Sequence, residues 1–192
     1  MRQLLAFVLL CAVFGSVAHA EPRDEWLEAA GPRVRPQDRR SAVLLQEGLL
    51  RSATLRELVT RVEGSNVLVF VSMNPFGPAH VSGALTWMVS AGGYRYLRVG
   101  LNASQLNDQT IATLGHELRH AIEVIEDATV VDQDSLVAMY RRIGFPSPAV
   151  PRLGWETTAA MEAGFQVRRE LVATPANTIA RRSDTKAPAK TS

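Results

Sequence analysis

Thr113-Leu-Gly-His116-Glu117-Leu-Arg-His120-Ala-Ile122 is the stretch that decides the fold we predict for this chain. It places His-Glu-x-x-His inside a run of residues that favour an α-helix. Each residue of a helix turns by about 100°, so two histidines four residues apart share one face. Apolar residues recur on the opposite face of the same helix, at Ile111, Leu114, Leu118, Ile122 and Ile125. One face therefore packs on a core, and the other presents polar side chains.

The spacing of His116 and His120 suits a zinc ion, because both imidazoles can reach one metal. Glu117 directly follows the first histidine. It is placed to hold and deprotonate a zinc-bound water without binding the metal itself. The alternative is a solvated amphipathic helix that carries two histidines and no metal. We predict a Zn²⁺ site in which Glu117 is the catalytic base.

Around these residues the sequence resembles the zincin superfamily of HExxH zinc metallopeptidases. The superfamily signature has uncharged residues around the histidines and an apolar residue after them. Most positions of residues 113–122 comply, whereas Arg119 departs. The resemblance implies a zincin-like fold and a zinc-dependent hydrolase, and it names no substrate. It also implies that a strand before the helix, here Tyr94 to Leu101, lies near the cleft.

A catalytic zinc bound by two histidines needs a third protein ligand. Metzincins have a further Gly and His after the motif, where this chain has Glu123 and Glu126. A deformylase-like site would need a cysteine, and Cys11, in the N-terminal segment, is the only one. A carboxylate remains, as in the gluzincin branch, where a later helix supplies a glutamate.

Glu156 is the third ligand that we expect, because it begins the last predicted helix on a face of small residues. Glu162 is the alternative, with Asp127 and Asp132 behind it. Glu123 shares the histidine face but lies about 8 Å along the helix axis from the midpoint of the two histidines. We therefore expect it either to contact His120 and orient that ring without binding the metal, or to be a solvated side chain.

A tetrahedral reaction intermediate also needs a hydrogen-bond donor for its oxyanion besides the metal. The candidates, which the sequence alone does not rank, are Tyr140, Tyr94, Tyr96, His80 and Arg119.

The hydrophobic pattern around the motif predicts an α+β domain. Strands are expected at about 66–73, 83–90 and 94–101, in a small antiparallel or mixed sheet. The motif helix is expected at about 107–127, and the other helices are expected at 41–63, in two parts, 133–143 and 156–172. This domain would extend over residues 38–173.

Several helix boundaries are also predicted. Thr54 with Glu57 forms a capping-box pattern, and Asn107 or Asp108 can cap the motif helix. Asp132 can cap the helix that follows.

The two ends of the chain differ from this domain. Residues 1–20 have a positive start, an apolar core and a small-x-small site ending at Ala20, which is typical of a secretory signal peptide. We expect cleavage near Ala20 and export to the periplasm or the cell exterior. Residues 21–37 predict an extended lead-in, and 174–192 a disordered tail.

The composition excludes some classes of function. The formal net charge is +2, and removal of residues 1–20, whose only charged side chain is Arg2, leaves +1. This balance argues against a nucleic-acid partner. After the signal peptide no segment is long and apolar enough to span a membrane. We expect a monomer that acts on a peptide or protein substrate.

Three functions follow from these patterns. The first is a secreted zinc metallopeptidase. The second is a catalytically inactive zincin-like binding or inhibitor module of the cell envelope. The third is a zinc hydrolase that acts on a non-peptide amide.

Overall fold

The computed structural model describes residues 31–74, 81–148 and 154–176. The predicted signal peptide, His80 and most of the predicted tail lie outside these residues. Among the described residues, no helix is long and apolar enough to cross a membrane.

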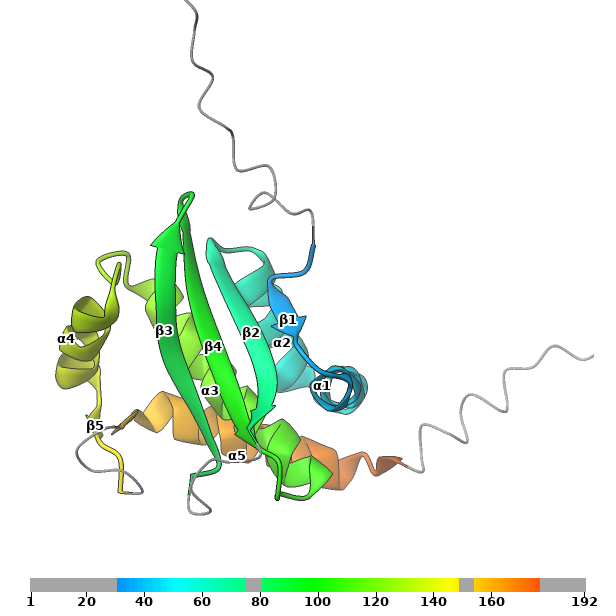
Figure 1. Cartoon of the computed structure of the whole chain (residues 1–192). Helices are drawn as coiled ribbons and strands as arrows, with labels where there is room; N and C mark the ends of the chain where they lie inside the picture. The colour runs from blue at the N-terminus through cyan, green and yellow to red at the C-terminus, as the bar shows by residue number, and fades with distance from the viewer. Residues whose placement is uncertain (1–30, 75–80, 149–153, 177–192) are drawn as a thin grey trace, which may run out of the picture. The chain divides into compact units, whose positions relative to one another are not determined.

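A four-stranded mixed sheet forms one layer of the fold, in the order β1-β2-β4-β3 (Figure 1). Its strands are β1 (Val34–Pro36), β2 (Val67–Asn74), β3 (Gly83–Ala91) and β4 (Tyr94–Asn102). The first three in this order run parallel, and β3 pairs antiparallel with β4. The three predicted strands are confirmed to within one residue at each end. β3 is an edge strand, whereas β4, which was expected near the cleft, is interior.

Strand β1 was not predicted. Its three residues lie within the segment 21–37 that we expected to be a lead-in, yet Val34 pairs with Val69 of β2 and is buried. An arginine and a proline occupy the rest of the strand, so no alternation of apolar and polar residues marks it.

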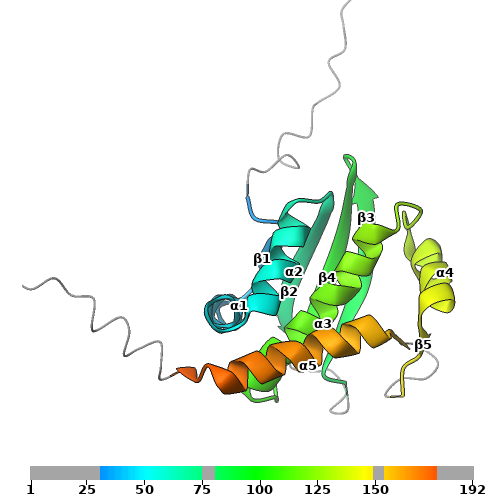
Figure 2. The same cartoon turned by 180° about the vertical axis from the view of Figure 1, so that it is seen from behind.

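Five helices accompany the sheet in the described residues, and the molecule is therefore of the α+β class. They are α1 (Arg39–Arg51), α2 (Ala53–Glu63), α3 (Asn107–Glu126), α4 (Gln133–Ile143) and α5 (Thr158–Ala173). From behind, α1, α2 and α3 lie over one face of the sheet, and α5 crosses α3 (Figure 2). The opposite face carries no described helix (Figure 1).

The helix ends show where side-chain capping was misjudged. Helix α2 begins two residues earlier than the Thr54–Glu57 pattern predicted, because the Ser52 side chain accepts from Leu55 N and is the N-cap. Neither Asn107 nor Asp108 caps α3, whose N-cap is Leu106 without a side-chain hydrogen bond. The prediction for α4 is confirmed, since Asp132 accepts from Ser135 N in a capping box.

The core lies between the sheet and α3. Four apolar residues of α3 are fully buried there: Ile111, Leu114, Leu118 and Ile122. On its other side α3 packs closely against α5 at Gly115, where a Cβ atom would lie 2.7 Å from Val167 Cγ2. Helix α3 is thus fixed between the sheet and α5. The stripe of polar side chains on α3 is only partly covered by these two elements.

Candidate metal centre

Two imidazoles project from the same stripe of α3. His116 is partly exposed and His120 is buried, and their ring centroids are 4.9 Å apart. This proximity follows directly from their four-residue spacing on a helix. Because the apolar residues of α3 face the sheet, the two rings point away from it, toward the segment that precedes α5.

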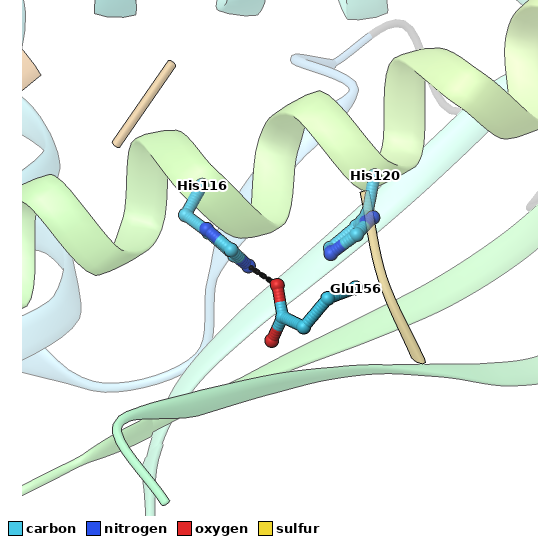
Figure 3. A group of neighbouring side chains, drawn as sticks. All are labelled: His116, His120 and Glu156. Atoms are coloured by element: carbon cyan, nitrogen blue, oxygen red, sulfur yellow. Dashed lines mark ion pairs between the residues drawn. The ribbon is translucent and has the colours of Figure 1, made fainter. Parts of the chain in front are cut away.

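Glu156 is the carboxylate that meets them, as Figure 3 shows. Its Oε2 atom lies 3.1 Å from His116 Nε2, and ligand atoms of His116, His120 and Glu156 all lie within 4.8 Å of one another. These three residues, named here the ligand cluster, could hold a metal ion. The sequence predicted this set, with one error in the local structure of Glu156.

Glu156 does not begin the last helix. It belongs to β6 (Trp155–Glu156), which pairs antiparallel with β5 (Phe145–Pro146). Helix α5 starts after it, with Thr157 as the N-cap. The close approach of β6 to the end of α4 depends on Gly144, where a Cβ atom would lie 2.6 Å from the Glu156 carbonyl oxygen.

In the ligand cluster, the carboxylate of Glu156 and the imidazole of His116 favour each other's charged forms. Burial raises the pKa of Glu156, but the neighbouring imidazoles of His116 and His120 outweigh burial and lower it overall. Burial likewise lowers the pKa of His116, whereas the carboxylates of Glu156 and Glu117 outweigh that and raise it. Glu156 Oε2 is nevertheless buried, and its ion pair with His116 Nε2 lacks the geometry of a hydrogen bond. Such an atom is uncommon in a folded protein.

A hydrogen-bonded chain holds His120 from behind. His120 Nδ1 lies 2.8 Å from Glu123 Oε2, and Thr157 Oγ1 donates to Glu123 Oε1 at 2.6 Å. All three residues are buried. A carboxylate accepts hydrogen bonds, so the proton of His120 resides on Nδ1 and its Nε2 lone pair is left for a metal. This is the contact that the sequence predicted for Glu123.

Glu117 is buried beside the two histidines, on the side of the edge strand. Burial raises its pKa, and the nearby histidines and a hydrogen bond from the backbone N–H of Leu85 only partly offset this. Strand β3 comes this close because of Gly83, where a Cβ atom would lie 2.6 Å from Thr113 Cγ2 and 3.0 Å from Glu117 Oε1. The carboxylate is therefore held in place by β3.

Tyr140 of α4 covers the other side of His120. The two rings meet edge to face, with centroids 5.4 Å apart, and Tyr140 is buried. Burial and the negative charges of Glu123, Glu117 and Glu156 raise the pKa of Tyr140 well above its ordinary value. Its hydroxyl group is therefore protonated at neutral pH and can donate a hydrogen bond.

The remaining acidic residues proposed as ligands lie elsewhere. Glu162 is exposed on α5. Asp127 accepts a hydrogen bond from Arg142, and Asp132 caps α4.

The other oxyanion donors that the structure describes are likewise engaged elsewhere. Arg119 pairs with Glu126. The Arg33 guanidinium stacks on Tyr94, and Tyr96 stacks with Phe70.

A cavity of about 840 Å³ opens in front of the ligand cluster, and His116, Glu117, His120, Tyr140 and Glu156 line it. The edge strand β3 and the two residues before it form one wall with Val81 to Thr86, and α5 and α4 supply others.

Sequence reasoning missed two residues that shape this site. Gly83 was assigned only to a strand, since nothing in the sequence shows that α3 would lie against it. Thr157 was overlooked as the cap of α5, although a threonine before an alanine-rich run is a recognisable cap signal.

Two imidazoles and one carboxylate form a donor set that divalent transition metals accept. A comparison of the chain with protein-family models found no matching family. Comparisons with curated proteins and with solved structures found no match either.

Proposed function

We propose that this chain is a zinc-dependent peptidase with a zincin-like arrangement of sheet and active-site helix. The observation that carries the proposal is the convergence of His116, His120 and Glu156 beside the buried Glu117, inside one cavity. A structural metal site would have no need of a buried, non-ligating carboxylate next to the metal position.

The residues present fit a zinc ion. Glu156 Oε2 is buried with an ion pair to His116 but no well-formed hydrogen bond, and it faces two imidazoles whose ring nitrogens lie within reach of one ion. When bound, zinc would polarise the carbonyl group of the substrate and lower the pKa of water. Three protein ligands leave a position open for that chemistry.

Glu117 is proposed as the general base. Its raised pKa brings the carboxylate closer to the range in which a base both accepts and returns a proton near neutral pH. The Leu85 N–H fixes the carboxylate, so that it can accept a proton from the attacking water and deliver it to the leaving amine. Tyr140, protonated and adjacent to His120, is proposed to donate to the developing oxyanion.

The edge position of β3 adds to this proposal. An exposed strand edge can pair with an extended peptide, and β3 forms one wall of the cavity. The predicted signal peptide would deliver the activity to the periplasm or the cell exterior.

The first experiment measures zinc content and peptide hydrolysis for the wild-type protein and three variants. We expect about one zinc per wild-type chain. Glu117→Gln should retain zinc and lose about 10²- to 10⁴-fold in turnover. Glu156→Gln should lose zinc. The control Glu162→Gln changes an exposed glutamate of α5 and should retain both zinc and activity.

Two results would contradict the proposal. Undiminished turnover in Glu117→Gln would remove Glu117 as the base. A folded wild-type protein that does not take up added zinc would remove the enzyme and favour the binding module.

A further inference from the structure

The cavity extends along α3 from the ligand cluster toward the start of the helix, and on the other side of the cluster it reaches α4. Its lining on α3 runs from Gln109 to His120, which corresponds to about 16 Å of helix at 1.5 Å per residue. An extended peptide rises about 3.3 Å per residue. The cavity therefore has room for about five residues of substrate.

Four Asp, Glu, Lys or Arg residues line this cavity in the part of the chain that the structure describes. They are Glu117, Arg141, Glu156 and Arg168. The two glutamates belong to the proposed zinc site, where a divalent cation balances their charge. The cavity is then left with the two arginines, and its charge becomes positive.

The two arginines lie toward opposite ends of the cavity. Arg141 follows Tyr140, which packs on His120, so it lies toward the His120 end of α3. Arg168 lies one helical turn beyond Gly164, where a Cβ atom would be 3.2 Å from His116 Cβ. Because α5 begins just after Glu156 and passes His116 at Gly164, Arg168 lies toward the opposite end.

Both guanidinium groups are exposed, and neither makes a hydrogen bond or an ion pair with another described residue. The next residue in each helix behaves differently. Arg142 binds Asp127, and Arg169 binds Gln166. The two arginines that line the cavity are thus left available to a ligand.

From this placement we infer that the cavity selects peptides with acidic side chains on both sides of the bond at the ligand cluster. The inference rests on the proposed function and specifies its substrate class. A guanidinium group offers a planar pair of donors that matches a carboxylate, and Arg141 and Arg168 can each bind one in this way. Phe165, 58% exposed and also in the lining, suits an apolar residue between the acidic ones.

The test measures binding, so that it does not depend on turnover. Zinc-loaded Glu117→Gln protein is titrated into three labelled eight-residue peptides, and fluorescence anisotropy gives each Kd. The peptides share an apolar centre and carry Glu, Gln or Lys on both sides of it. We expect the Glu peptide to bind about two- to fivefold more tightly per arginine than the Gln peptide, and the Lys peptide to bind most weakly.

Arginine variants identify the cause. Arg168→Gln and Arg141→Gln should each remove one factor of about two to five from the preference for Glu, and the double variant should abolish it. Arg169→Gln and Arg142→Gln, in the neighbouring positions, should leave the preference unchanged. The preference should also shrink at high salt, because the charges are exposed.

The outcomes separate this inference from the proposed function. Equal Kd values for the Glu and Gln peptides would overturn the inference, even if the wild-type protein hydrolyses both. A preference that survives the double variant would overturn it as well. A charge-dependent preference in a wild-type protein that hydrolyses none of the peptides would uphold the inference and remove the peptidase.

Discussion

Helices α3 and α5 meet two polar clusters, one near each end of α5, and the clusters differ in how fully their atoms are bonded. The ligand cluster lies at the start of α5, where Glu156 Oε2 has an ion pair with His116 but no well-formed hydrogen bond. The second, named here the anchor cluster, lies near the end of α5 and consists of Arg51, Asp108 and Glu170 with the residues that they contact. Both contain buried or partly buried charges.

In the anchor cluster every donor of Arg51 is used. Its guanidinium group donates to both carboxylate oxygens of Asp108, to Glu47, and to the carbonyl groups of Leu171 and Thr174. These bonds account for all five N–H groups of an arginine. A saturated cluster has nothing to offer a ligand, whereas an unsaturated, convergent one does. We therefore expect the anchor cluster to stabilise the fold and the ligand cluster to bind a ligand.

The largest expected effect on stability tests the anchor cluster. Arg51→Met should lower the free energy of unfolding by about 3 kcal/mol, because it leaves a buried carbonyl group, a partly buried one and Asp108 without their donor. Urea denaturation of the metal-free protein measures this. Zinc affinity, measured with a competing chelator, should change by less than about twofold. A large loss of zinc affinity would show that the two clusters are coupled.

The next largest effect is expected in the ligand cluster, where a substitution should change the affinity for zinc. Glu123→Gln should weaken zinc binding about 10- to 100-fold, because the hydrogen bond that orients His120 loses its charged acceptor. The control is Glu126→Gln on the same helix, which removes an exposed partner of Arg61 and Arg119. It should leave zinc affinity unchanged. Equal zinc affinity in both variants would mean that Glu123 does not orient His120.

The third prediction concerns the anchor cluster and how its contribution to stability depends on pH. Burial raises the pKa of Glu170, but hydrogen bonds from Ser52, Gln166 and Thr54 outweigh it and lower the pKa from 4.5 to about 2. A lowered folded-state pKa stabilises the fold above the ordinary value, and this contribution is lost as the pH falls from 4.5 toward 2.

Glu170→Gln should therefore lower the free energy of unfolding by about 1–2 kcal/mol at neutral pH. The difference from the wild-type protein should disappear as the pH falls through that range, as denaturation curves at several pH values would show. A difference that persists unchanged at pH values near 2 would place the stabilisation elsewhere.

The sequence predicted the elements whose pattern is long and periodic. Helix α3 begins at the predicted residue 107 and ends one residue before the predicted 127, because one apolar face extends over its whole length. The meeting of His116 with His120 follows from helix geometry alone. The approach of Glu156 is a tertiary contact. The exclusion of other ligand types pointed only to a carboxylate, and Glu156 was chosen for its expected place at the start of a helix with a face of small residues.

The errors have a common physical origin in short segments. Strand β1 and the β5–β6 pair contain only two or three residues each, too few to show any period. These segments are strands because of the segments with which they pair, and no pattern in their own residues indicates it. The predicted helix start at Glu156 was wrong for a related reason, since Thr157 accepts a hydrogen bond from Ala160 N as the N-cap of α5 and ends the preceding strand.

Thr157 is also where the smallest effect is expected, because it serves both the fold and the ligand cluster. Its hydroxyl group accepts from Ala160 N as the cap of α5 and donates to Glu123 Oε1. Thr157→Val should lower the free energy of unfolding by about 1 kcal/mol and weaken zinc binding about two- to fivefold. Thr157→Ser keeps the hydroxyl group and should restore both. If the valine variant loses stability but binds zinc as tightly as the wild-type protein, then Glu123 holds His120 without help from α5.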